Sequence, residues 1–325
     1  MMKIIADSGS TKTDWTLLGE GGEVLATCHS QGLNPYHLSE EEILSVLRNE
    51  VKKSFMPDGR SNERLEIFFY GSGVTEAMIP KMERLLVEAF SKESQQVSGE
   101  GFADVQAHAA SDMLGAARAL LGHEAGIAVI LGTGSNSCYY DGERMQQGVP
   151  PLGYILGDEG SGTAIGKAFL RLLLRHPKAS TLKDEFFRWS GMDYAKLIDR
   201  IYRQPLANTY LASVSTFVGE KLKELEETLT NAIQAKEAQA QATKAGEANI
   251  DETKIQYELL AEMVKQVYLD FCHQILSHYE KGTVGFVGSI AYYFQKYISA
   301  ALQESGFTMG RVLRSPMDGL ICYHS

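Results

Sequence analysis

The chain has 325 residues, of which 44% are hydrophobic, and a net charge of −10. This length allows two domains with substantial cores, and the acidic balance argues against a nucleic-acid partner. Its four cysteines (Cys28, Cys138, Cys272 and Cys322) form no C-x-x-C pair, and its eight histidines form no metal-binding pattern. A disulfide framework and a structural zinc site are therefore not expected. No apolar run is long enough to cross a bilayer and the N-terminal strand is too short for a signal peptide, so we expect a cytoplasmic protein without a membrane partner.

The first predicted strand, residues 4–6, ends at the carboxylate of Asp7 and is followed by a turn of small residues. Such a turn exposes backbone N–H groups that can bind phosphate oxygens, and Asp7 could hold a Mg²⁺ that shares those oxygens. Lys12-Thr13 resembles the end of a P-loop, but the preceding glycine is missing and a strand follows from Trp15, so the P-loop interpretation fails. An ordinary Gly-Ser hairpin turn is the alternative.

The same arrangement recurs in the middle of the chain. Residues 127–131 have the pattern of a buried strand, residues 132–134 form a second turn of small residues, and residues 137–140 form another strand. The hairpin signal Asp141-Gly142 follows. This recurrence predicts a duplicated architecture. Ser137 stands where a dinucleotide-binding fingerprint needs its third glycine, so that class is excluded.

Strands alternate with helical patterns along the chain, which predicts an α/β fold with sheets covered by helices. We expect an N-terminal lobe over residues 1–110 and a C-terminal lobe over residues 111–325, with the last segment packing back on the first lobe. The other expected elements are strands at residues 65–70, 105–107 and 284–287 and helices at residues 75–93, 113–121, 160–174 and 290–302.

Three polar positions each have a structural and a functional interpretation. Asp112 follows a strand at a helix start, where it is either a helix cap or a general base for a substrate hydroxyl. The segment Gly157-Asp158-Glu159-Gly160 places two carboxylates at another helix start, where they either cap the helix or hydrogen-bond sugar hydroxyls. Asn34-Pro35 is either a plain turn or an amide that recognises a substrate group.

Residues 220–262 differ from the rest of the chain. They contain ten acidic and five basic residues, and residues 235–249 have no apolar side chain larger than that of Ala. Such a composition favours helix but cannot anchor it to a core. We expect a solvated helical hairpin or a flexible loop, with an oligomerisation arm as the alternative.

Together these motifs resemble the N-acetylglucosamine kinase and BadF/BadG/BcrA/BcrD-type ATPase branch of the actin, hexokinase and heat-shock-chaperone superfamily. The resemblance covers nearly the whole chain and implies two ribonuclease H-like, actin-like ATPase lobes with a cleft for ATP and sugar between them. The motifs that carry it are Asp7-Ser8-Gly9-Ser10-Thr11-Lys12-Thr13, Leu131-Gly132-Thr133-Gly134-Ser135-Asn136, Gly157-Asp158-Glu159-Gly160-Ser161 and Gly288-Ser289-Ile290-Ala291.

The resemblance also implies the cofactors ATP and Mg²⁺ and a role for each matching position. Asp112 would be the catalytic residue, and Asp7 would belong to the metal site. The positions implied to bind the cofactor are Gly9, Ser10, Thr11, Lys12, Thr13, Gly132, Thr133, Gly134, Gly288 and Ser289. Those expected to bind the sugar are Asn34, Ser72, Ser135, Asn136 and Asp158.

The chain departs from the family pattern at a few points. Ser8 and Ser10 stand where many relatives have Gly, and the segment 220–262 is longer than in typical relatives. The zinc-binding cluster of the related glucokinase-type repressors and kinases is absent. The paired Cys that holds an iron–sulfur cluster in dehydratase-activator ATPases is also absent, which favours a kinase over an activator.

We therefore expect a sugar kinase that uses ATP to phosphorylate an N-acetylated amino sugar, with N-acetylglucosamine and its 6-phosphate as the first choice. N-acetylmuramate and other amino sugars are alternative substrates. A nucleotide-driven switch that acts on a protein partner and a sugar sensor without turnover are the alternative functions. A homodimer is left open.

Overall fold

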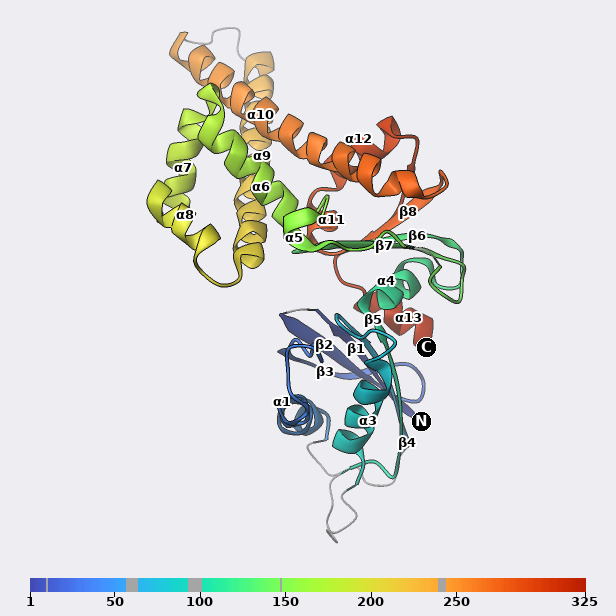
Figure 1. Ribbon diagram of the computed structural model, residues 1–325. Coiled ribbons are helices and arrows are strands. Elements are labelled where there is room, and N and C mark those ends of the chain that lie inside the picture. The colour runs from blue at the N-terminus through green and yellow to red at the C-terminus, as the bar shows by residue number, and fades with distance from the viewer. Residues whose placement is uncertain (10, 57–63, 93–100, 147, 239–243) are drawn as a thin grey trace. The chain divides into compact units, whose positions relative to one another are not determined.

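The computed structural model (Figure 1) divides into two compact units. Unit 1 comprises Met1–Ala128, Cys138–Gln147 and Ser315–Ser325, and unit 2 comprises Val129–Ser137 and Gly148–Arg314. For residues 235–238 and 244–249 the structure describes the backbone alone. The described residues are 1–9, 11–56, 64–92, 101–146, 148–238 and 244–325.

Unit 1 is built on a five-stranded sheet with the strand order β3-β2-β1-β4-β5. β1 pairs antiparallel with β2 and parallel with β4, and the parallel pairing continues from β4 to β5. The apolar residues of β1 lie in the core, which is why this strand was recognisable in the sequence. The strands are β1 (Met2–Ser8), β2 (Lys12–Leu18), β3 (Val24–Gln31), β4 (Arg64–Gly71) and β5 (Asp104–Ser111).

The helices of unit 1 begin at clear sequence signals. Ser39 and Glu42 form a capping box at the start of α1, in which the Ser39 N–H donates to Glu42 Oε2 at 2.8 Å and the Glu42 N–H donates to Ser39 Oγ at 3.2 Å. α1 continues through a π-helix, η1, into α2. The helices are α1 (Glu40–Val46), η1 (Leu47–Lys52), α2 (Lys53–Phe55), α3 (Ile79–Phe90), α4 (Asp112–Leu121) and α13 (Met317–His324).

α4 and α13 pack against each other within unit 1. Gly319 of α13 makes this close approach possible, because a Cβ at this position would collide with the carbonyl oxygen of Ala119. The unit boundary lies at Ala128, after α4, whereas the sequence placed the change of lobe at residue 110. Helix α4 therefore groups with the sheet that precedes it.

His324, at the end of α13, is buried against β4. Its Nε2 lies 2.8 Å from the hydroxyl of Tyr70, its ring stacks on Phe68 with 3.8 Å between ring centres, and its carbonyl oxygen accepts a hydrogen bond from Lys3. Burial, together with the positive charges of Arg118 and Lys3, lowers the pKa of His324 to about 4. The imidazole is consequently neutral in the folded chain at neutral pH.

We expect His324 to make unit 1 less stable in mild acid. The unfolded chain binds a proton near pH 6.5 and the folded chain binds it only near pH 4, so stability falls as the pH drops through this window. In His324→Gln, the melting temperature should depend less on pH between 6.5 and 4 than in the wild type. The exposed His37 provides the control, because His37→Gln should keep the wild-type slope. Equal slopes in His324→Gln and the wild type would contradict the assignment.

The second sheet repeats part of the first. Its strand order is β7-β6-β8-β9, and β8 pairs parallel with β9. Tyr140, the last residue of β7, forms an isolated antiparallel bridge with Met145. The first sheet has the strand β3 at the corresponding position. The strands are β6 (Gly126–Leu131), β7 (Ser135–Tyr140), β8 (Thr283–Val287) and β9 (Thr308–Leu313).

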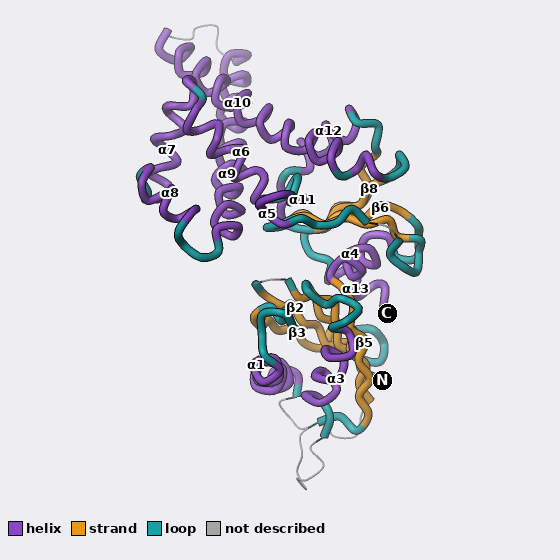
Figure 2. Tube along the Cα trace, viewed as in Figure 1, coloured by secondary structure: helices purple, strands orange, loops and turns teal. Residues whose placement is uncertain are grey.

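In unit 2, most of the helices lie in one group beyond the edge of the sheet (Figures 1 and 2). α6 and α9 pack closely, and Gly166 permits this because it has no Cβ. A Cβ there would collide with the carbonyl oxygen of Leu211. The sequence did not predict α7 and α8. The elements are α5 (Gly153–Leu156), α6 (Gly162–Arg175), η2 (Pro177–Ala179), α7 (Ser180–Ser190), α8 (Tyr194–Tyr202), α9 (Ala207–Ala238), α10 (Lys244–Gln274), η3 (Leu276–His278), α11 (Ser289–Tyr293) and α12 (Gln295–Glu304).

The acidic segment 220–262 falls on α9 and α10, which pack against each other. Its described part is helical, as the composition suggested. Leu222 and Leu225 are buried, whereas Ile233 further along α9 is 59% exposed. The packing of α9 against the core therefore ends before Ile233. Residues 239–243 lie outside the described part, and the oligomerisation arm stays a prediction.

Candidate functional site

The first turn (residues 8–13) joins β1 to β2 in unit 1. Its Gly9 N–H donates to the carbonyl oxygen of Lys12 at 2.9 Å, which closes the turn. The hydroxyl of Thr13 is buried, lies 2.8 Å from Ser8 Oγ and donates to the carbonyl oxygen of Gln31 at 2.9 Å. The Thr13 hydroxyl therefore stabilises the turn and does not face solvent.

Other predicted residues of the first turn are accessible. Gly9, Thr11 and Lys12 are exposed, and the ammonium group of Lys12 lies 2.9 Å from a carboxylate oxygen of Asp14. Ser10 lies outside the described residues. The roles of these residues in nucleotide binding stay predictions, but their accessibility is compatible with contacts to phosphate.

Asp7, at the end of β1, has an unusual electrostatic environment. Burial and repulsion from the carboxylates of Asp112 and Asp14 raise the pKa of Asp7 to about 7. A divalent cation beside Asp7 would relieve this repulsion. Mg²⁺ typically uses one or two carboxylates together with substrate phosphates and water, so Asp7 next to a phosphate-type turn fits this ion.

Asp112 is the first residue of α4 and not its cap. The side chain of Ser111 caps the helix by accepting a hydrogen bond from the Leu114 N–H at 3.2 Å, and Asp112 Oδ1 accepts one from the Met113 N–H at 2.9 Å. Burial raises the pKa of Asp112. Ser111 already caps the helix, so capping does not explain why a carboxylate that is costly to desolvate occupies position 112.

Asn34 and Ser72 lie close together in unit 1. The side chain of Asn34 packs on Gly73, where any Cβ would collide with it, and Asn34 Oδ1 accepts a hydrogen bond from the Tyr36 N–H at 2.9 Å. The Ser72 N–H donates to the carbonyl oxygen of Ser8 at 2.8 Å, which joins this pair to the first turn. The structure thus places Asn34 and Ser72 beside the first turn, and their role in sugar binding stays a prediction.

The second turn (residues 132–134) joins β6 to β7 and is held by the start of α6. The Gly162 N–H donates to the carbonyl oxygen of Gly132 at 2.9 Å, and Thr163 Oγ1 donates to that of Thr133 at 2.6 Å. Within the described residues, no hydrogen bond occupies the N–H groups of Thr133 and Gly134. These two donors are open to an anion, and the phosphate role expected for this turn stays a prediction.

Asp158 lies directly against the second turn. Its Oδ1 accepts a hydrogen bond from the Ser135 N–H at 3.2 Å, and a Cβ at Gly134 would lie 2.8 Å from Asp158 Oδ1. Asp158 has a φ of 60°, a left-handed conformation that is uncommon outside glycine, although Asp tolerates it better than most residues. Such backbone strain is often found at functional sites.

Asn136 and Gly288 complete the predicted residues of unit 2. Asn136 Oδ1 accepts a hydrogen bond from the Ser137 N–H at 2.9 Å, which leaves its amide NH₂ for a ligand. Gly288 has a φ of 123°, and a Cβ there would collide with the carbonyl oxygen of Leu131, so Gly288 and Ser289 adjoin the strand that leads into the second turn. Their nucleotide and sugar contacts stay predictions.

The sequence interpretation missed Lys167 of α6. Its ammonium group donates to the carbonyl oxygen of Tyr154 at 2.5 Å and interacts with the carboxylates of Asp158 and Glu159. Burial lowers the pKa of Lys167, and the pKa of Asp158 is raised by burial. Lys167 thus stabilises the negative charge of Asp158. In the sequence, the only signal for this role of Lys167 is its position in the second turn of α6, shortly after the loop that contains Asp158 and Glu159.

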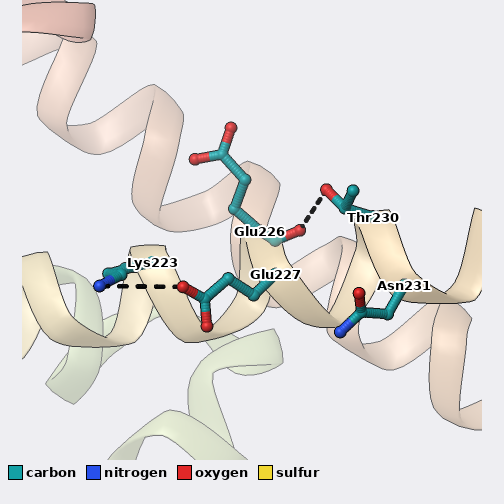
Figure 3. Close-up of a pocket in the computed structure, with 5 residues that line it drawn as sticks. All are labelled: Lys223, Glu226, Glu227, Thr230 and Asn231. Carbon is teal, nitrogen blue, oxygen red and sulfur yellow. Dashed lines mark hydrogen bonds and ion pairs between the residues drawn. The ribbon is translucent and has the colours of Figure 1, made fainter.

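Two hollows in unit 2 lie away from the predicted site residues. One, of about 440 Å³, lies beside α9 and is lined by charged and polar side chains that interact with one another (Figure 3). Within it, Lys223 lies 3.8 Å from Glu227, and Thr230 Oγ1 donates to the carbonyl oxygen of Glu226 at 2.8 Å. The other, of about 490 Å³, lies between α6 and α10. Neither hollow includes a predicted site residue.

In the described part of the chain, no group of three or more His, Cys, Asp or Glu side chains is arranged to hold a metal ion. Likewise, none of its helices is both long and apolar enough to span a membrane.

The two sheets identify the class of protein. The order β3-β2-β1-β4-β5, its partial repeat β7-β6-β8-β9 and the turn of small residues after the first strand of each define two ribonuclease H-like lobes of the actin-like ATPase type. This confirms the fold class expected from the sequence. Solved structures of known proteins extend the assignment.

A Porphyromonas gingivalis protein provisionally named as an N-acetylglucosamine kinase is 34% identical, with a TM-score of 0.74 over 99% of this chain and 98% of that one. The chain therefore belongs to the N-acetylglucosamine kinase family. A Chromobacterium violaceum protein of the same provisional name shares the fold at 17% identity, with a TM-score of 0.61 over 100% of this chain and 99% of that one. No protein-family model and no curated protein sequence matches the chain.

Proposed function

We propose that the chain is an ATP-dependent kinase that phosphorylates an N-acetylated amino sugar, with N-acetylglucosamine as substrate and its 6-phosphate as product. The observation that carries this proposal is the half-buried carboxylate of Asp112, whose pKa is raised by desolvation and which lies at a helix start that Ser111 already caps. Family membership supports this substrate class, because the P. gingivalis relative carries the provisional name N-acetylglucosamine kinase.

In the proposed reaction, Asp112 orients the sugar hydroxyl and accepts its proton as the oxygen bonds to the γ-phosphorus of ATP. The bond from that phosphorus to the bridging oxygen breaks at the same time, and ADP leaves. Phosphoryl transfer needs positioning and charge neutralisation more than covalent chemistry, which suits the second turn with the open N–H groups of Thr133 and Gly134. Asp7 would hold Mg²⁺, which neutralises charge on the phosphates when bound. Asn34, Ser72, Ser135, Asn136 and Asp158 provide amide, hydroxyl and carboxylate groups suited to sugar recognition.

ADP release from ATP should be measured with a panel of amino sugars and with ATP alone. Stimulation by N-acetylglucosamine, with phosphate recovered on its 6-hydroxyl, supports the proposal. Stimulation by a different amino sugar would replace the substrate but keep the reaction. ATP hydrolysis that no sugar stimulates would favour the nucleotide-driven switch, and sugar binding without turnover would favour the sensor.

Asp158→Asn should affect sugar binding more than chemistry. Asn also tolerates a left-handed backbone, so the loop should keep its conformation while the sugar loses a charged acceptor. We expect the KM for the sugar to rise more than kcat falls. Glu159→Gln, next to it, is the matched control and should change KM little. A variant that loses only thermal stability, with KM unchanged, would make Asp158 a structural residue.

A further inference from the structure

The larger of the two hollows in unit 2 is a groove of about 490 Å³ between α6 and α10, and its floor is apolar. Ile255, Leu259 and Met263 recur every four residues along one face of α10, and Leu172 of α6 lines the same floor. Ile255 is 37% exposed, and the other three side chains are half-buried. An apolar stripe that stays in contact with water and has polar rims is typical of an interaction surface.

The two rims of this groove carry opposite charges. His176 and Lys178 lie on the side of α6 and η2, whereas Glu258 and Glu262 lie on the side of α10, and all four side chains are exposed. Among the residues that the structure describes, Lys178 and Glu262 form no ion pair, and Glu258 meets only Lys254, at 3.8 Å. Both rims therefore have charge available for a partner.

A groove with one basic and one acidic rim is complementary to itself. A second copy can be related to the first by a two-fold axis that lies in the plane of contact and runs along the groove. The acidic rim of each copy then meets the basic rim of the other, and the two apolar floors face each other. Most homo-oligomers are two-fold dimers in which the same patch of both subunits forms the interface. Opposite charges at the rim fix the register of such a contact.

We propose that the groove between α6 and α10 is the interface of a homodimer, in which each copy places its acidic rim on the basic rim of the other. The occupant is a second copy because the groove itself supplies both the charges and the apolar surface that such a partner must offer. The inference does not depend on the proposed function. It gives a role to part of the acidic segment 220–262, since Glu258 and Glu262 belong to it.

The first test measures the mass of the full chain in solution by light scattering. The wild type should be a dimer. Lys178→Glu reverses the basic rim, and the double variant Glu258→Lys/Glu262→Lys reverses the acidic rim. In a dimer of either variant, both rim contacts bring like charges together, which should weaken association at least about 100-fold. Each variant should therefore be monomeric at concentrations where the wild type is a dimer.

Mixing the two rim variants is the sharpest measurement. In a mixed dimer, the reversed basic rim of one copy meets the reversed acidic rim of the other, and the two unchanged rims also meet. Dimers should therefore reappear on mixing. Lys196→Glu is the matched control, because Lys196 is an exposed lysine of α8 outside the groove, and it should keep the wild-type mass.

A second variant tests the floor independently of the rims. Ile255→Glu places a charge on the apolar floor at an exposed position, so it should dissociate the dimer and leave the melting temperature of the monomer unchanged. Neither rim variant should restore its dimer on mixing.

Three outcomes would overturn the inference. A wild type that is monomeric at every concentration would show that the groove binds no second copy. A dimer that survives in both rim variants and in Ile255→Glu would place the interface elsewhere on the chain. Rim variants that are monomeric alone and stay monomeric when mixed would contradict the pairing of the two rims. The kinase assay reports on the proposed function separately, and its failure would leave this inference intact.

Discussion

Asp112→Asn should bind both substrates and lose most phosphoryl transfer. The amide preserves the shape of the side chain and can still accept the Met113 N–H, but it cannot accept the proton of the sugar hydroxyl. General-base catalysis is typically worth about 10²- to 10⁴-fold in rate, so kcat should fall by this factor. The measurement is kcat at saturating ATP and sugar, with binding followed separately by calorimetry.

The melting temperature of Asp112→Asn distinguishes a catalytic role of Asp112 from a structural one. Because burial raises the pKa of Asp112, its replacement by a neutral amide removes a desolvation cost and should not lower the melting temperature. Asp318→Asn is the matched control, since Asp318 lies in the first turn of α13 in the same unit but is exposed. Near wild-type turnover in Asp112→Asn would remove it from the catalytic machinery.

Gly132→Val should weaken ATP binding while the protein stays folded. A Cβ at Gly132 would meet no atom within 4 Å, so the new side chain enters open space beside the Thr133 and Gly134 N–H groups. There it would block the approach of phosphate to those donors. Loss of one or two hydrogen bonds to a charged group costs about 1.5–3 kcal/mol each, so affinity should fall at least about 10-fold.

The choice of glycine decides what this experiment shows. At Gly134 a side chain would collide with the carboxylate of Asp158, so a loss of activity there would mix sugar and nucleotide effects. Gly282→Val is the matched control, because Gly282 is exposed in the same unit and also has open space around it. Unchanged ATP affinity in a folded Gly132→Val variant, measured by calorimetry, would contradict the phosphate role of the second turn.

Local sequence patterns predicted the parts of the fold that local physics determines. The apolar strands before the two turns, the strand after Lys12 and the start of α6 were all recognisable, because hydrophobic periodicity and small-residue turns act over a few residues. The β6–β7 pair of the second sheet was predictable because the strand-turn-strand pattern of β1 and β2 recurs there, whereas β9 was not predicted.

Tertiary packing decided the features that the sequence did not reveal. The assignment of α4 to unit 1 depends on Gly115, which packs on Tyr70, and on contact with a helix about 200 residues later in the chain. The partnership of Lys167 with Asp158 depends on the left-handed turn between them. Ser and Asp both commonly cap helices, so the sequence alone does not show whether Ser111 or Asp112 is the cap. The hydrogen bonds of the structure show that it is Ser111.

The order in which a ribosome makes the chain adds a constraint on its biogenesis. The sheet of unit 1 is synthesised before unit 2, whereas α13, which packs on α4, is synthesised after it. While unit 2 is being translated, the apolar face of α4 therefore lacks α13, the helix that packs on it in the folded chain. Unit 1 can complete its folding only after unit 2 has been made, so the nascent chain exposes an apolar surface that chaperones can recognise throughout that interval.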